Sequence, residues 1–265
     1  MWRSLVYFTL FVVAQVFAAA LALAYVGACG GTADTAVLMT EENAVPVGVS
    51  LLVAEGMLSL ALGWWMLAGR KLRRLSFLSC GAREIERKSS TSTDVLRAVM
   101  GVLFLSVAVS QVSDIFSLPD GGTAELFEGM RHSPLCLLLI CFVGPLTEEL
   151  VFRAGIVRSL VLRGLQGWVA AVVSAAAFGA VHGNLAQALP AFVIGVVLGL
   201  LYLRTGDIRM CLPAHVANNV LGVALLCFPS LESVKESWTL AAVSLAAGAY
   251  LLYGALSSEK KKKKD

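Results

Sequence analysis

The sequence predicts an all-α membrane protein, a polytopic bundle of about eight transmembrane helices with at least one helix tilted or broken near a functional site. Hydrophobic residues make up 58% of the chain and charged residues only 15%, and the mean hydropathy is +0.79. Long apolar runs alternate with short charged connections. This composition excludes a disordered chain and a nucleic-acid reader, so we expect no nucleic-acid partner.

Eight apolar runs are candidates for spans, because a helix needs roughly 20 apolar residues to cross a hydrocarbon core of about 30 Å. The fifth and seventh runs are short, and the fourth is long and carries charge. The runs are 5–27, 44–68, 95–118, 134–162, 167–182, 185–203, 210–228 and 238–256.

Lysine and arginine concentrate in every second connection between the predicted spans. Because basic loops lie on the cytoplasmic side, this alternation supports the division into eight spans independently of hydropathy. The opposite connections are rich in aspartate and glutamate, so an integral, multi-pass protein with both termini in the cytoplasm fits the chain. The basic positions are the loop 70–97, Arg158 with Arg163, Arg204 with Arg209, and the lysine tail 260–264.

The first run has a second interpretation, a cleaved signal peptide, because Ala22-Leu23-Ala24 is a small-residue site and Cys29 ends a loose lipobox. Its length favours a span. None of the six cysteines forms a CxxC pair, so we expect no disulfide framework and no thiolate metal site. We divide the chain into three spans with a basic loop (1–132), a catalytic core (133–228), and the last span with its tail (229–265).

Ionisable residues inside apolar runs are candidates for function, because a charge at the bilayer centre costs at least about 2.5 to 3.5 kcal/mol. Glu55 and Asp114 have no ionisable residue at helical spacing in the sequence, and for them a packing or loop-proximal role is favoured. The remaining intramembrane ionisable residues fall into three short segments.

In the first segment, Glu148 and Glu149 precede Arg153 within the fourth run. Neighbouring helical residues project about 100° apart, so both carboxylates cannot aim at one spot, whereas Glu149 and Arg153 at i,i+4 share a face and can pair. Glu148 is then free to face a polar cavity and take a proton from water. The alternative is an ion-pair network between helices with no chemistry.

The second and third segments each place a histidine on a helical face with one partner. Phe178 lies one turn before His182, so its ring can pack beneath the imidazole. Pro213 suits a helix start, which puts His215 in the first turn, with Asn219 four residues on as a second hydrogen-bond donor. Each residue could be structural, but together they supply what peptide hydrolysis needs.

The ordered triple of Glu148-Glu149-xxx-Arg153, Phe178-xxx-His182 and His215-xxx-Asn219 resembles the CPBP family of intramembrane proteases, which includes the Rce1-type CAAX prenyl endopeptidases and bacterial Abi-type relatives. The resemblance covers roughly residues 133–228. It implies that the chain hydrolyses a peptide bond of a membrane-embedded or lipidated peptide.

Carried over residue by residue, the resemblance implies that Glu148 is the general base on a water held by His182. His215 and Asn219 would stabilise the oxyanion, with Glu149, Arg153 and Phe178 in support. No cofactor is required in this interpretation. Zinc stays open as an alternative, with Glu148, His182 and His215 as three ligands around an open water position.

The depths of these residues differ along ideal helices of about 1.5 Å rise per residue: Glu148 lies about 22 Å from Arg163, and His215 only about 9 Å from Arg209. We therefore expect the fifth or seventh span to be tilted, displaced or broken, with an extended stretch before Pro213 that lines a water-filled cavity.

A non-catalytic membrane protein is the rival interpretation, either a transporter or an immunity or assembly factor that uses the polar cluster structurally. Other membrane protease classes fit poorly, because the sequence has no HExxH, no rhomboid GxSG, and no aspartate motif matching Thr205-Gly206-Asp207. The sequence does not choose among prenylated, leader-peptide and other membrane substrates, and it leaves the oligomeric state open.

Overall fold

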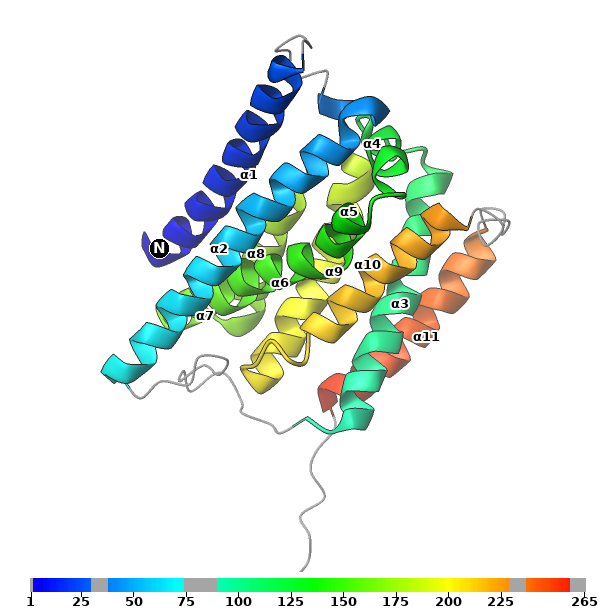
Figure 1. The fold of residues 1–265 in the computed structure, drawn as a ribbon. Helices are drawn as coiled ribbons and strands as arrows, with labels where there is room; N and C mark the ends of the chain where they lie inside the picture. The colour runs from blue at the N-terminus through cyan, green and yellow to red at the C-terminus, as the bar shows by residue number, and fades with distance from the viewer. Residues whose placement is uncertain (1, 30–37, 74–89, 229–236, 258–265) are drawn as a thin grey trace, which may run out of the picture.

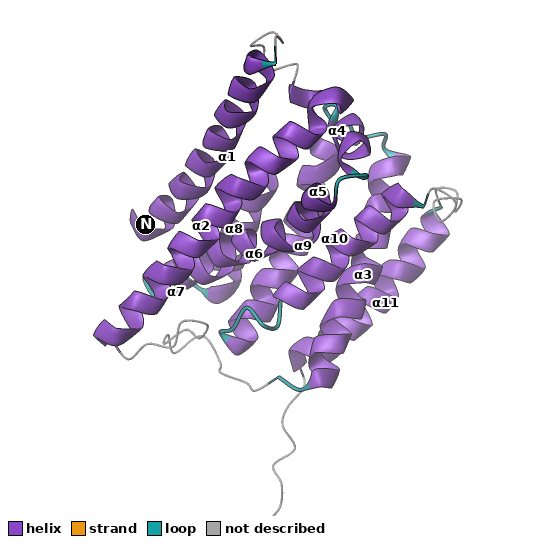
Figure 2. Ribbon diagram, viewed as in Figure 1, coloured by secondary structure: helices purple, strands orange, loops and turns teal. Residues whose placement is uncertain are grey.

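The computed structural model describes residues 2–29, 38–73, 90–228 and 237–257, and the side chains of these residues except 67–73. Most of the predicted basic loop and the whole lysine tail lie outside the described residues. All regular secondary structure in the described part is helical (Figures 1 and 2). The prediction of an all-α bundle is therefore confirmed.

The helices follow the predicted runs closely, with two additional short helical segments, η2 and α4, in the connections after the first and third runs. In chain order they are α1 (Trp2–Ala28), η2 (Glu41–Asn43), α2 (Ala44–Arg73), α3 (Ser92–Ile115), α4 (Thr123–Met130), α5 (Pro134–Leu138), η3 (Leu139–Val143), α6 (Gly144–Glu148), η4 (Glu149–Val157), α7 (Arg158–Val161), α8 (Gly167–Ala180), α9 (Leu185–Thr205), α10 (Leu212–Cys227) and α11 (Trp238–Ser257). Elements α5 to α7 form one continuous rod in which η3 and η4 are π-helical.

Six helical segments in the described residues are long and apolar enough to cross a membrane. The other two apolar helices, α8 with 14 residues and α10 with 16, are shorter. At about 1.5 Å per residue they extend only about 21 and 24 Å, less than a hydrocarbon core of about 30 Å. Phe178 and His215 lie on these two short helices, and His182 lies two residues past the end of α8.

Contacts between distant residues show which helix ends lie together. Asp94 at the start of α3 lies 3.8 Å from Arg204 at the end of α9, and a side chain at Gly167 would touch Leu203. At the opposite end, the rings of Phe116 and Trp238 are 6.0 Å apart. The arginine-bearing connections therefore share one end of the bundle, at the bottom of Figure 1.

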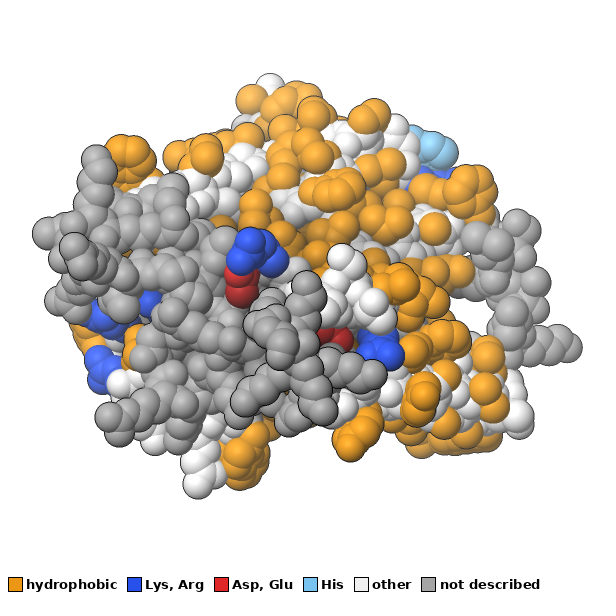
Figure 3. Space-filling model, turned by 90° about the horizontal axis from the view of Figure 1, so that it is seen from below, with side chains coloured by type: hydrophobic (Ala, Val, Ile, Leu, Met, Phe, Trp, Pro, Cys, Tyr) orange, Lys and Arg blue, Asp and Glu red, His pale blue; other side chains and the backbone are white. Residues whose placement is uncertain are grey.

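The outer surface is apolar, as a lipid-facing surface must be. Leu60, Trp64 and Tyr250 are 77%, 76% and 78% exposed, although each lies within an apolar helix. Figure 3 looks onto the arginine-bearing end, where charged side chains lie among hydrophobic ones that extend over the sides. In a soluble protein such exposed apolar side chains would favour aggregation. In a bilayer they contact the lipid chains instead of water.

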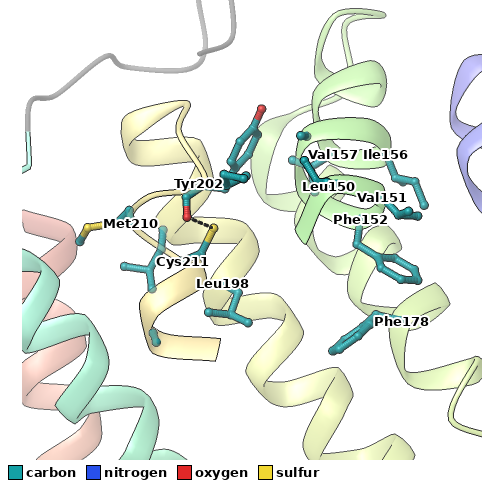
Figure 4. Close-up of a cluster of buried hydrophobic side chains, with 14 of the residues drawn as sticks. Leu150, Val151, Phe152, Ile156, Val157, Phe178, Leu198, Tyr202, Met210 and Cys211 are labelled. Atoms are coloured by element: carbon teal, nitrogen blue, oxygen red, sulfur yellow. Dashed lines mark hydrogen bonds between the residues drawn. The ribbon is translucent and has the colours of Figure 1, made fainter. Parts of the chain in front are cut away.

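The main hydrophobic core surrounds the central rod. The core side chains labelled in Figure 4 come from η4, α8, α9 and the turn before α10, and include Phe152, Phe178, Leu198 and Met210. Helices α1, α2, α3, α10 and α11 contribute further side chains to the same core. On the outer side of the bundle, α3 and α11 approach closely through Gly101 and Gly248. Small residues at such a contact allow the two backbones to pack without a hydrophobic driving force.

Candidate active site

The rod from α5 to α7 carries the glutamate motif, and its π-helical turns follow from its sequence and its neighbours. Pro145 has no N–H to donate to the carbonyl one turn before it, so regular α-helical bonding is interrupted. Carbonyls of the π-helical segments also accept from side chains of neighbouring helices: Phe152 O from Ser174 Oγ at 2.9 Å, and Ile140 O from Asn219 Nδ2 at 2.8 Å. π-Helical turns of this kind are frequently found at functional sites.

Glu149 and Arg153 form an ion pair of 2.9 Å between Oε1 and Nη1, the pairing that their spacing predicts. Their side chains are 0% and 1% exposed. Arg153 Nη2 also donates to the Gly195 carbonyl at 3.3 Å, and its guanidinium lies 4.8 Å from the centre of the Phe178 ring. Such a buried charge needs this set of partners, because an unpaired one is costly to desolvate.

His215 lies between the two glutamates. Its Nδ1 is 2.8 Å from Glu149 Oε1, and its Nε2 is 3.2 Å from Glu148 Oε2. The expectation that the carboxylates cannot aim at one spot is therefore only half right: they project differently, yet they reach the two nitrogens of one imidazole. Arg153, Glu149, His215 and Glu148 form one continuous chain of polar contacts.

Glu148 is the most exposed member of this series of polar contacts. Its side chain is 17% exposed, against 5% for His215 and 0% for Glu149. Polar atoms of Glu149 and Arg153 are directed into the protein, whereas Glu148 retains access from outside. Only Glu148 among the linked carboxylates can therefore meet a water molecule or a substrate.

Phe178 joins the second motif to the third. Its ring centre lies 4.9 Å from that of His182 and 5.8 Å from that of His215, both edge-on. His182 Nδ1 donates to the Phe178 carbonyl at 2.8 Å, because a carbonyl oxygen can only accept. That bond leaves Nε2 of neutral His182 as an acceptor nitrogen.

Asn219 lies one helical turn beyond His215 on α10, as the sequence predicts. One N–H of its amide is used by Ile140 O, and its oxygen accepts from Asn218 Nδ2 at 3.3 Å. The second N–H of Asn219 remains available as a donor. The structure thus brings His182 and His215 to the ring of Phe178, places Glu148 against His215, and anchors Asn219 to the neighbouring η3.

The expected extended stretch before Pro213 is wrong. Residues 208–211 form a tight turn in which Leu212 N donates to Ile208 O at 2.8 Å, and Ile208, Met210 and Cys211 are buried. Pro213 does lie in the first turn of α10. The difference in depth is accommodated by the short helices α8 and α10 and by the buried turn, whereas the break in regular helix falls in the fourth span.

The residues as arranged do not fit the zinc alternative. Within the described part of the chain no three histidine, cysteine or acidic side chains are grouped so that they could hold a metal ion. His215 directs both nitrogens at glutamate oxygens, so it has no lone pair aimed at a position shared with His182.

Several site neighbours give no signal in the sequence. Ser174, Gly195 and Ile140 form direct hydrogen bonds with residues of the motif segments that lie 22 to 79 positions away in the sequence. None is ionisable, so a search for intramembrane charges cannot find them. Only a motif shared among relatives or the folded structure identifies such residues.

Comparisons with known proteins agree with the geometry of this core. Residues 131–221 match the family model described as "Type II CAAX prenyl endopeptidase Rce1-like". The chain is 25% identical over 159 residues to "Putative membrane peptidase YdiL" of Bacillus subtilis (strain 168), an alignment that covers 58% of this chain and 65% of that protein. No solved structure matches.

The matched residues contain all three motifs and lie over the rod, α8, α9 and the first half of α10. The division of the chain at 133 and 228 is not tested by the match and stays a prediction. Over this core the chain is therefore similar to the Rce1-type CAAX prenyl endopeptidases and to the protein named "Putative membrane peptidase YdiL", in agreement with the resemblance to the CPBP family that its motifs carry.

Proposed function

We propose that this protein is an intramembrane endopeptidase that hydrolyses a peptide bond in a membrane-embedded or lipidated peptide, with Glu148 as the general base. The observation that supports it best is the buried chain from Arg153 through Glu149 and His215 to Glu148, whose last member alone is partly exposed. A purely structural ion-pair network has no need of an exposed fourth member.

The charges of these four linked side chains suggest how many protons they carry and where. Two carboxylates face one guanidinium, so one further proton makes the buried set neutral, as a low-dielectric environment favours. The contact of 3.2 Å between His215 Nε2 and Glu148 Oε2 is where that proton is shared. With the proton on His215, Glu148 is an ionised carboxylate that can act as a base.

Hydrolysis then follows from the hydrogen-bonding roles of these groups. A water molecule donates one hydrogen to Glu148 and the other to His182 Nε2, and its oxygen attacks the substrate carbonyl carbon. The proton passes to Glu148 as the C–O bond forms. Protonated Glu148 holds the His215 Nε2–H less strongly, so this donor and the second Asn219 N–H stabilise the oxyanion. Glu148 then delivers its proton to the leaving nitrogen as the C–N bond breaks.

The test is cleavage by purified protein in lipid vesicles. The substrates are a farnesylated peptide ending in a CAAX sequence, the same peptide without the lipid, and a membrane-spanning peptide. We expect Glu148→Gln to lower kcat by about 10²- to 10⁴-fold, the usual contribution of a general base. Glu128→Gln makes the same change at the surface, where Glu128 pairs with Arg131 at 2.8 Å, and should leave cleavage unchanged.

Two results would contradict the proposal. Equal turnover by wild type and Glu148→Gln would remove the glutamate from the chemistry. Absence of cleavage of all three peptides by folded wild-type protein would favour the transporter or the immunity-factor interpretation. Comparison of the two CAAX peptides reports whether the lipid is part of the recognised substrate.

Metal dependence is tested on the same preparation. We expect activity to persist after dialysis against EDTA in metal-free buffer, because the mechanism above uses only protein groups. Loss of activity that added zinc restores would instead support Glu148, His182 and His215 as ligands.

We also propose that the arginine-bearing end faces the cytoplasm, following the distribution of basic residues. Both termini then lie on the cytoplasmic side. Protease protection of a C-terminal tag in sealed inverted vesicles tests this, since a protected tag would contradict it.

A further inference from the structure

Glu55 is a buried acid on α2, outside the residues matched by the family model. The residue is 6% exposed, and from the sequence a packing role is favoured because it lacks a partner at helical spacing. In the structure it lies against the rod that carries the glutamate motif: its backbone carbonyl accepts from Thr147 Oγ1 at 3.3 Å. Thr147 immediately precedes Glu148.

The two oxygens of the Glu55 carboxyl group have different surroundings. Oε1 accepts from Gln15 Nε2 of α1 at 2.8 Å. Oε2 is buried and has no hydrogen-bond partner among the described residues. A buried polar atom without a partner is costly, so the position of Oε2 calls for a functional explanation.

Oε2 is directed at the face of α6 that carries Glu148. It lies 3.5 Å from the position that a Cβ atom on Gly144 would occupy. Gly144 precedes Glu148 by four residues, and helical side chains lean over the preceding turn, so the Glu148 carboxylate leans over Gly144. The charge of Glu148 acts on the Glu55 carboxyl group, and Gly144 has no side chain to fill the space on this face of α6.

Two neighbouring carboxylates are not both charged at low cost. Among the polar groups on the elements packed against α2, Gln15 and Glu148 are those that act on the Glu55 carboxyl group. Neither is a cation. Glu148 is the more exposed of the two acids and already contacts His215, so the charge belongs on Glu148 and the additional proton on Glu55.

We propose that Glu55 is a positioning residue of the same site: as a neutral acid it donates from Oε2 to the Glu148 carboxylate across Gly144. This hydrogen bond and the one from His215 hold the carboxylate from two sides, and a lone pair remains for the attacking water. The inference rests on the proposed function, and extends the site to α2 and, through Gln15, to α1.

The first test is spectroscopic and needs no substrate. Infrared spectra of the protein in vesicles should contain the carbonyl stretch of a protonated carboxylic acid that disappears in Glu55→Gln. In Glu148→Gln this band should persist at a different frequency, because its acceptor is now an amide. Ser59→Ala is the matched control: it removes a 2.6 Å contact with Thr147 Oγ1 on the same α2–α6 seam and should leave the band unmoved.

The second test is kinetic. Glu55→Met keeps the volume but removes the donor, so kcat should fall about 10- to 100-fold with KM unchanged, the effect of one hydrogen bond to a charged group. Glu55→Gln keeps a donor and should restore kcat to within about threefold of wild type. Ser59→Ala should lower only thermal stability.

Each outcome bears on one proposal. An unchanged spectrum in Glu55→Gln, or equal kcat in Glu55→Met and wild type, would overturn the role of Glu55 while leaving the function intact if Glu148→Gln is inactive. A loss in Glu55→Gln as large as that in Glu55→Met would also overturn it. If Glu148→Gln retains full turnover, the proposed function itself fails, whatever the Glu55 variants do.

Discussion

The central rod and the outer spans are both apolar helices, yet they differ in what surrounds them. In the most apolar part of the rod, 56% of residues are buried inside the protein, against 17% in α1 and 28% in α3 and in α11. Outer helices therefore face lipid along most of their length. The rod is surrounded by protein, so it can carry Glu149 and Arg153, which form an ion pair with each other inside the bundle.

The comparison shows where in a membrane protein charged residues are tolerated. Lipid offers no hydrogen bonds, so an ionisable residue on an outer helix is tolerated only where it turns inward. Glu55 on α2 follows this rule, because it is directed at the rod and accepts from Gln15 rather than facing lipid. Substitutions in the two regions should therefore destabilise the protein for different reasons: loss of a buried ion pair in the rod, and loss of helix packing in the outer spans.

The largest expected effect on stability comes from breaking the ion pair of the rod. Arg153→Met leaves Glu149 buried without its cation, which should cost about 3 to 5 kcal/mol in the free energy of unfolding. Thermal denaturation in detergent measures this loss as a lower Tm. The double variant Arg153→Met with Glu149→Gln removes both charges and should recover more than half of the loss. A single variant as stable as wild type would contradict the distinction between rod and outer spans.

A smaller effect should follow from separating two outer helices. A side chain on Gly248 would meet the α3 backbone at Gly101 O and Leu105 N, at 3.0 and 3.1 Å. Gly248→Leu should therefore destabilise the protein by about 1 to 3 kcal/mol, with kcat per folded molecule unchanged. Gly63→Leu is the control, because nothing lies within 4 Å of its Cβ position. A fall in kcat per folded molecule in Gly248→Leu would show that α11 is coupled to the site.

The sequence predicts the outer part of the molecule well, since hydropathy and the alternation of basic loops depend on local composition. The predicted run 238–256 differs from α11 by one residue. Helix α4 was missed because its eight residues are shorter than a span and mixed in polarity. The spacing of Glu149 and Arg153 also predicts a contact, because four residues along a helix is a local distance.

The site is predicted less completely, because its contacts join positions far apart in the chain. The motifs identify Glu148, His182 and His215, but spacing alone does not reveal that His215 bridges both glutamates, 66 residues from Glu149. The hydrogen bond from Asn219 to Ile140 O in the rod likewise joins residues 79 positions apart. Glu55 appears isolated in the sequence for the same reason, since its neighbours belong to other helices.

The smallest expected effect concerns the connection between α3 and α4, outside the spans. Asp120 accepts backbone N–H bonds from Ala124 at 3.0 Å and Gly122 at 3.4 Å, and these bonds hold the pKa of its carboxyl group below the ordinary value. A lowered folded-state pKa means that the stabilisation is present above the unfolded-state pKa and is lost as pH falls through the folded-state pKa. Asp120→Ala should therefore lower Tm slightly at neutral pH, and the difference from wild type should shrink under acid conditions. Asp120→Asn keeps the acceptor without the charge, so its Tm relative to Asp120→Ala should not depend on pH; a pH-independent gap between wild type and Asp120→Ala would show that the charge contributes nothing to the start of α4.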